Sequence, residues 1–143
     1  MKPMPPMNAW EASVDERERA DPLWRMQSYR LSLYAFELGW KDAQALDRTR
    51  VTRHIAPQLY DALGSIGANV AEGYSRSSGM DRARFFEYGL GSTRESVVWY
   101  RGARPVLGPA LVEDRIETLT RIRQLLLATI PRERSRRLRR ADD

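Results

Sequence analysis

The stretch that decides the fold is PQLYDALGSIGANV, residues 57–70. Apolar residues recur in it at intervals of three and four, at Leu59, Leu63, Ile66 and Val70. This is the period of an α-helix that buries one face. Proline is tolerated in the first turn of a helix, so the stretch predicts a helix with Pro57 in its first turn.

Before this stretch, the same period runs from Leu23 to about Leu46. Asp21-Pro22 precedes it, and aspartate followed by proline is a typical helix start, because aspartate caps the free N–H groups and proline suits the first turn. The polar residues 47–53 cannot extend the apolar face, so we expect a connection there.

After the stretch, two more helices are predicted. Ser78 and Asp81 have the spacing of a capping box, which marks the start of the first of them. We expect it to end at Arg104-Pro105, because proline disfavours the helical conformation in the residue before it. Gly108-Pro109 indicates a loop and a new start, and the last helix is expected to stop at Pro131.

Four helices joined by short connections, with no convincing strand, predict an all-α fold. Short connections favour antiparallel neighbours, so we expect an up-down-up-down four-helix bundle over residues 21–131. Residues 1–20 contain three early prolines and read as a flexible N-terminal extension, in which a short helix near Trp10–Arg19 is conceivable. Residues 132–143 form an arginine-rich C-terminal tail.

The composition excludes several classes of site. The 143 residues include no cysteine and one histidine, His54, which removes disulfides, thiolate nucleophiles and zinc sites built from paired imidazoles. The chain contains no GxSxG, P-loop, GxGxxG or HExxH motif, and no small-molecule cofactor or metal is implied. With no long apolar run and no signal-peptide pattern, we expect a cytoplasmic protein without membrane contact.

The charge is concentrated in arginine. The net charge is +5 at pH 7, and arginine-rich segments attract phosphate groups by releasing condensed counterions. Two segments are therefore candidate nucleic-acid contacts, one between the first two helices and one in the tail: Arg48, Arg50, Arg53, Arg132, Arg134, Arg136, Arg137, Arg139 and Arg140. The alternative for the tail is a solvated C-terminus.

Polar residues also line one face of two helices. Ser65, Asn69 and Glu72 share a face of the second helix, and Ser92 and Glu95 share a face of the third. Two such rows on neighbouring helices can satisfy each other, which predicts a hydrogen-bond network that fixes the pairing of the helices. A recognition or catalytic site is the alternative interpretation.

The pattern S-I-x-x-N-[IV]-A-E-G-Y-x-R at residues 65–76, followed by a leucine-glycine-serine step at residues 90–92, resembles the four-helix-bundle proteins named for bacterial 23S rRNA intervening sequences. These are related to the accessory variability protein of diversity-generating retroelements. The resemblance covers about residues 23–131. It implies a ring-shaped homopentamer, basic surfaces that bind nucleic acid or a reverse transcriptase, and no catalytic residues. The positions that match its signature are Ser65, Asn69, Glu72, Gly73, Arg76, Ser92 and Glu95.

The sequence departs from the family pattern at three positions. Tyr60 and Asp61 stand where family members commonly have two arginines, and Val97 stands where they often have a second acid. The lost arginine pair removes positive charge from the second helix.

Three functions follow as hypotheses. The first is a non-enzymatic oligomer that binds RNA or DNA with little sequence specificity. The second is an oligomeric protein-interaction scaffold, for example accessory to a reverse transcriptase, because aromatic anchors such as the four tryptophans are enriched at interfaces. The third and least supported is an enzyme that uses Glu72 or Glu95 as an acid or base.

Overall fold

A computed structural model describes residues 3–136 of the chain. The regular structure within these residues is entirely helical, with no strand. In chain order the helices are α1 (Met7–Ser13), α2 (Glu16–Arg19), the 3₁₀ helix η1 (Pro22–Arg25), α3 (Gln27–Asp47), α4 (Ile55–Tyr74), α5 (Gly79–Leu107) and α6 (Pro109–Arg134). The prediction of an all-α fold is confirmed.

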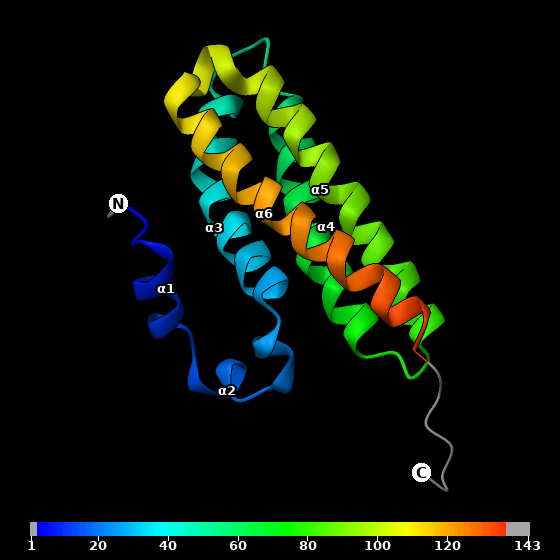
Figure 1. The fold of residues 1–143 in the computed structure, drawn as a ribbon. Coiled ribbons are helices and arrows are strands. Elements are labelled where there is room, and N and C mark those ends of the chain that lie inside the picture. Colours follow the sequence, from blue (N-terminus) through cyan, green and yellow to red (C-terminus); the bar gives the residue numbers. More distant parts are fainter. Residues whose placement is uncertain (1–2, 137–143) are drawn as a thin grey trace, which may run out of the picture.

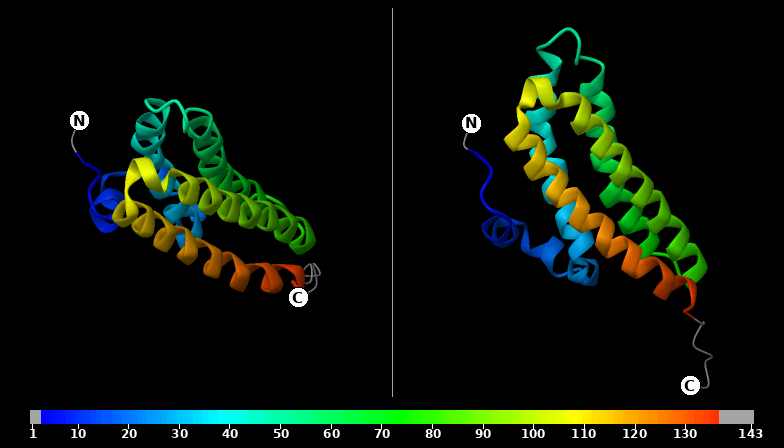
Figure 2. Two further views of the ribbon diagram at one scale, coloured as in Figure 1. Left: turned by 90° about the horizontal axis from the view of Figure 1, so that it is seen from above. Right: turned by 45° about the horizontal axis from the view of Figure 1, so that its top comes forward.

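The four long helices pack side by side (Figure 1). α4 lies between α3 and α5, and α5 packs against α6, which also contacts α3. In Figure 1, α3 and α5 run towards the top of the view and α4 and α6 run towards the bottom, and Figure 2 shows the same neighbours from two further directions. None of the described helices is long and apolar enough to span a membrane.

The core lies between these helices. The predicted apolar face of α4 is fully buried, with Leu59, Leu63, Ile66 and Val70 all at 0% exposure. Facing residues of α5 and α6 complete this core, and the largest of them are Phe86, Tyr100, Leu119, Ile122 and Leu126.

Glycine permits a close approach between α4 and α5. A methyl group on Gly73 would lie 2.8 Å from Phe86 Cε1 and 3.0 Å from the carbonyl oxygen of Arg82. Contacts this short would force α5 to shift, so this position favours a residue without a side chain.

Two of the predicted helix boundaries are correct. The Ser78 hydroxyl accepts a hydrogen bond of 3.1 Å from the Asp81 N–H, so the capping residue at the start of α5 is confirmed. Gly108 separates α5 from α6 with φ of 87°, a left-handed conformation that side chains other than glycine rarely adopt.

The expected ends at proline are wrong. α5 continues through Pro105 to Leu107, and α6 continues through Pro131 to Arg134. Each proline forfeits its own hydrogen bond to the carbonyl four residues earlier, but only two helical residues follow Pro105 and three follow Pro131, so only a short segment lies beyond the proline. Gly108, rather than proline, ends α5.

One expected helix start also shifts. Asp21 accepts a hydrogen bond of 3.0 Å from the Leu23 N–H, but it caps only the short helix η1. The backbone is extended at Met26, and α3 begins afterwards. The position expected for Pro57 is confirmed: α4 starts at Ile55, and Pro57 falls in its first turn, where the missing N–H has no helical partner.

The N-terminal segment, assigned from the sequence to an extension, carries two short helices. Trp10 on α1 is 4% exposed, and its indole N–H donates to the Glu37 carboxylate on α3. The ring centroids of Trp10 and Tyr34 lie 5.4 Å apart, and the Tyr34 hydroxyl donates to the Pro5 carbonyl oxygen at 2.8 Å. One buried aromatic residue therefore docks α1 on α3.

A buried polar cluster, which the sequence analysis missed, ties α3 to α5 and α6. The Asp42 carboxylate accepts a hydrogen bond of 2.6 Å from the Tyr100 hydroxyl and one of 2.8 Å from Arg115 Nε. Asp42 is 3% exposed and Tyr100 is 1% exposed. Burial and the adjacent carboxylate raise the pKa of Tyr100. Burial alone would lower the pKa of Arg115, but its hydrogen bond to Asp42 raises it.

Candidate nucleic-acid interface

The first predicted basic segment lies in the connection between α3 and α4. Arg48, Arg50 and Arg53 are all exposed there. Arg53 Nε donates to the Asp47 carbonyl oxygen at 3.3 Å. The side chains of Arg48 and Arg50 make no hydrogen bond or ion pair to any residue in the range 3–136. Their charges are therefore available to an outside partner.

Two further arginines reach the same end of the molecule. Arg101 and Arg104 are exposed on the last turns of α5 and line a cavity of about 280 Å³ with Glu113. The end of α5 adjoins the start of α4, since a methyl group on Gly102 would lie 3.5 Å from Ile55 Cδ1.

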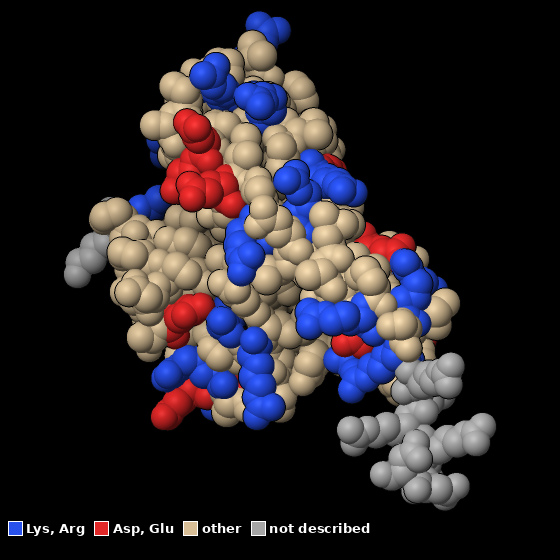
Figure 3. Space-filling view, in the orientation of Figure 1, with Lys and Arg blue, Asp and Glu red and all other residues tan. Residues whose placement is uncertain are grey.

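We call Arg48, Arg50, Arg53, Arg101 and Arg104 the loop-end surface. Arg101 and Arg104 also lack ion pairs and side-chain hydrogen bonds among the described residues. Basic side chains gather at this end in Figure 3, above an acidic patch. The sequence analysis missed these two arginines, although their spacing of three at a helix end could have revealed them.

The second predicted segment lies at the opposite end of the molecule, where α6 finishes (Figure 1). Arg132 Nε donates to the Ala128 carbonyl oxygen at 3.3 Å, Arg134 pairs with Glu87, and Arg136 Nη1 lies 3.4 Å from a Glu133 carboxylate oxygen. Arg132 and Arg134 belong to the last turn of α6. The remaining predicted contacts, Arg137, Arg139 and Arg140, lie outside the described residues.

The two basic segments therefore do not form one surface. The structure places them at opposite ends of α4, α5 and α6. The arginines of the loop-end surface are largely unpaired, whereas the described C-terminal arginines all have hydrogen-bond or ion-pair partners.

The polar row on α4 makes its hydrogen bonds within its own helix. The Ser65 hydroxyl donates to the Asp61 carbonyl oxygen and the Asn69 amide donates to the Ser65 carbonyl oxygen, each at 2.8 Å. Glu72 pairs with Arg76 one turn later, and both are exposed.

The row on α5 behaves in the same way. The Glu95 carboxylate accepts a hydrogen bond of 3.2 Å from Trp99 Nε1 on the same helix, and the Ser92 hydroxyl makes no hydrogen bond to the described residues. The predicted network between the two helices is therefore wrong for the described side chains. A short serine side chain reaches its own i−4 carbonyl more readily than a neighbouring helix.

Among the family-signature residues, Gly73 and Arg76 have clear packing roles. Gly73 allows the close approach of α5, and the Arg76 guanidinium lies 4.7 Å from the centre of the Phe85 ring as well as pairing with Glu72. Neither glutamate proposed for the enzyme hypothesis is enclosed, because Glu72 and Glu95 are both exposed.

Residues 3–136 contain no group of three His, Asp or Glu side chains that could hold a metal ion. His54 is exposed at the start of α4, and its side chain caps none of the helix N–H groups.

Comparison with models of protein families, with curated proteins and with solved structures found no match to this chain.

Proposed function

We propose that the protein is a non-enzymatic, oligomeric binding protein that holds the phosphate backbone of RNA or DNA with little sequence specificity. The observation that carries the proposal is the loop-end surface, where Arg48, Arg50, Arg101 and Arg104 have no intramolecular partner among the described residues. Unpaired guanidinium groups can bind phosphate without first breaking an ion pair.

The surface supports contact with the backbone rather than with bases. Residues 48–53, RTRVTR, include no aromatic side chain on which a base could stack. Contacts to phosphate fix position but carry no sequence information. Binding is therefore expected to tolerate any sequence and to weaken steeply with salt.

We further propose that α3–α6 form an antiparallel four-helix bundle and that the bundle is the subunit of a homopentameric ring in the cytoplasm, as the family resemblance implies. Exposed large apolar side chains support assembly: Trp40 is 50% exposed, Tyr88 51% and Val98 62%. Such side chains are typical of protein interfaces. A ring would repeat the loop-end surface once per subunit.

The same apolar side chains favour a second candidate function. An oligomeric scaffold for a protein partner, such as a reverse transcriptase, would use them without contacting nucleic acid directly. The two functions differ in whether purified protein alone binds a nucleic acid.

The test is fluorescence anisotropy with labelled RNA and DNA over a salt series, on protein whose oligomer mass is measured by light scattering. Each phosphate contact on a duplex contributes about −0.9 to the slope of log affinity against log salt concentration. The double variant Arg48→Gln/Arg50→Gln is expected to make the slope shallower by about 1.8 for each engaged subunit.

The matched control is Arg25→Gln/Arg94→Gln, which removes the same charge from two exposed arginines that also lack partners but lie elsewhere. We expect this control to keep the wild-type slope. A chain that ends at Arg136 keeps all of α6 and tests the contribution of the last seven residues separately.

Two results would contradict the proposal. The first is flat anisotropy at low salt with an intact oligomer, which leaves the scaffold as the better interpretation. The second is an equal loss of binding in the loop-end variant and in its control, which shows that net charge rather than this surface determines affinity.

A further inference from the structure

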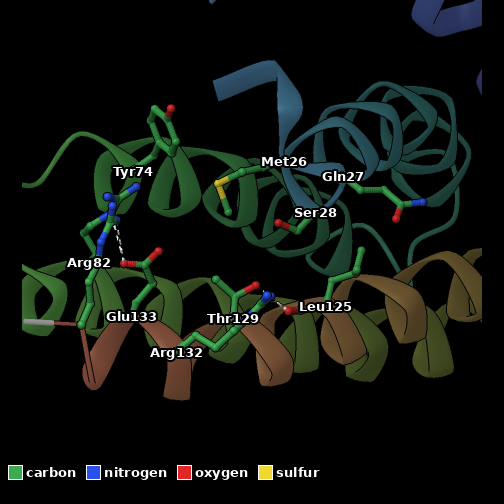
Figure 4. A pocket seen from close by; sticks show the side chains of 10 residues that line it. Met26, Gln27, Ser28, Tyr74, Arg82, Leu125, Thr129, Arg132 and Glu133 are labelled. Atoms are coloured by element: carbon green, nitrogen blue, oxygen red, sulfur yellow. Dashed lines mark hydrogen bonds and ion pairs between the residues drawn. The ribbon is translucent and has the colours of Figure 1, made fainter. Parts of the chain in front are cut away.

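A cavity of about 560 Å³ lies between the start of α3 and the end of α6 (Figure 4). The end of α4 and the first turn of α5 also contribute side chains to it. Its lining combines apolar, hydroxyl and charged groups: Met26, Gln27, Ser28, Tyr74, Arg82, Leu125, Thr129, Arg132, Glu133 and Arg136. The proposed function does not use this cavity, which lies at the end opposite the loop-end surface.

The start of α3 meets the cavity with free backbone donors. Met26 precedes the helix and provides no side-chain cap. The N–H groups of Tyr29 and Arg30 donate to the Met26 carbonyl oxygen, at 3.1 and 3.2 Å, whereas those of Gln27 and Ser28 have no partner within residues 3–136. The free N–H groups of a 21-residue helix carry a partial positive charge, which attracts anions.

Ser28 adds a side-chain donor at the same place. The residue is 3% exposed and lines the cavity, yet its hydroxyl makes no hydrogen bond to the described residues. The hydroxyl oxygen itself is not fully enclosed, so a molecule in the cavity can reach it. A hydroxyl left free beside unused N–H groups points to an acceptor that the protein itself does not supply.

On the other side of the cavity, two guanidinium groups share one carboxylate, and a third guanidinium group has no acidic partner. The same oxygen of Glu133 lies 3.6 Å from Arg82 Nε and 3.4 Å from Arg136 Nη1, and Arg132 pairs with no acid in residues 3–136. One negative charge therefore faces three positive charges. The cavity carries an excess of about two positive charges, beside the positive end of α3.

Arg82 is held in place but is incompletely satisfied. Its guanidinium carbon lies 5.0 Å from the centre of the Tyr74 ring, and its side chain is 15% exposed. Its Nε is the one buried side-chain nitrogen or oxygen of the described residues that lacks a hydrogen-bond partner. Because this Nε is fully enclosed and lies 3.6 Å from a Glu133 oxygen, it holds the guanidinium group beside the cavity rather than offering a donor to it.

From this arrangement we propose that the cavity binds a phosphomonoester group. A phosphomonoester carries about two negative charges at neutral pH, which matches the excess positive charge, and its three oxygens can accept from the Ser28 hydroxyl, the free N–H groups and the guanidinium groups. Met26 and Leu125 offer apolar contact for the organic part of the ligand. The group could belong to a free mononucleotide or to the 5′-phosphorylated end of a strand.

The first experiment is isothermal titration calorimetry of the full chain with adenosine 5′-monophosphate, and with adenosine at the same ionic strength. We expect the monophosphate to bind and adenosine not to bind. Binding should weaken as the pH falls below about 6, where the phosphate loses its second charge. Ten-nucleotide strands with and without a 5′-phosphate then distinguish the two sources of the group, since only a strand-end site prefers the phosphorylated strand.

Two variants test the location. Arg132→Gln removes an exposed charge from the lining and is expected to weaken binding of adenosine 5′-monophosphate about tenfold or more. Ser28→Ala removes only the free hydroxyl and should weaken binding several-fold. The matched control is Arg94→Gln, an exposed arginine of α5 outside the cavity, which should leave the affinity unchanged.

The inference fails if adenosine 5′-monophosphate does not bind at millimolar concentration, or if both cavity variants bind it as tightly as the wild type. This outcome is independent of the proposed function, because the Arg48→Gln/Arg50→Gln variant leaves the cavity intact. Loss of strand binding in that variant with unchanged binding of the monophosphate would separate the two sites.

Discussion

Replacing Asp42 with alanine is expected to destabilise the fold more than any surface substitution. The Asp42 carboxylate is 3% exposed and accepts hydrogen bonds from the Tyr100 hydroxyl at 2.6 Å and from Arg115 Nε at 2.8 Å. Arg115 is only 15% exposed. Without the Asp42 carboxylate, the buried Tyr100 hydroxyl loses its partner, and Arg115 keeps only its ion pair with Asp114, at 2.8 Å.

The magnitude follows from the burial of the pair. Removing one member of a buried ion pair costs about 3–5 kcal/mol when the remaining charge has no other partner. Because Arg115 keeps its ion pair with Asp114, we expect the lower end of this range, about 3 kcal/mol. Tyr100→Phe breaks only one hydrogen bond to the carboxylate and leaves Arg115 paired, so a smaller loss of about 1.5–3 kcal/mol is expected. Since domains of this size are stable by about 5–15 kcal/mol, Asp42→Ala removes a large part of the total.

The assay is urea denaturation followed by circular dichroism at 222 nm, with the oligomer state checked for each variant. The control is Glu72→Ala, which breaks the exposed i,i+4 pair with Arg76 and should change the free energy of unfolding by about 0.5 kcal/mol or less. If Asp42→Ala unfolds within 1 kcal/mol of the wild type, the cluster does not stabilise α3 against α5 and α6, and the reasoning is refuted.

Three further outcomes are expected. Burial and the neighbouring carboxylate raise the pKa of Tyr100, so the unfolded chain loses the phenol proton at a lower pH than the folded chain does. Above pH 10, the free energy of unfolding should therefore fall by up to about 1.4 kcal/mol per pH unit more in the wild type than in Tyr100→Phe. Urea titrations from pH 9 to 11 would measure this difference. Gly73→Ala places a methyl group 3.0 Å from a backbone oxygen of α5 and should lower the free energy of unfolding by about 1–3 kcal/mol. A methyl group at Gly91 would meet no neighbouring atom within 4 Å, so Gly91→Ala should raise the free energy of unfolding by up to about 1 kcal/mol in the same denaturation assay. Trp10→Ala should release α1 without unfolding the long helices, seen as rapid proteolysis confined to the first 20 residues, and uniform proteolysis of the whole chain would contradict this.

The positions of the four long helices could be predicted because their buried faces repeat with the helical period. Leu59, Leu63, Ile66 and Val70 are all fully buried, as their spacing indicated. The ends were harder to predict, because a helix can continue for a few residues beyond a proline at the cost of one hydrogen bond. Pro105 and Pro131 therefore stay inside their helices.

The polar contacts were harder still. Tyr100 lies 58 positions after Asp42 in the chain, and Arg115 lies 73 positions after it. No local sequence pattern therefore joins the three residues. Conversely, Ser65 and Asn69 lie on one face of a helix as predicted but bond within it. Spacing along a helix gives the face of a side chain, while its partner depends on the neighbouring helix and on competition from the helix's own carbonyl groups.

The distribution of arginine pairing gives a stronger guide to binding than the composition does. The tail looked like the better phosphate contact from the sequence, since six of the last twelve residues are arginine. In the structure, Arg134 already pairs with Glu87 and Arg136 with Glu133, so a phosphate must replace an existing carboxylate at each of them. At Arg48 and Arg50 no such replacement is needed. The net gain per contact is therefore expected to be larger at the loop-end surface, although that segment has fewer arginines.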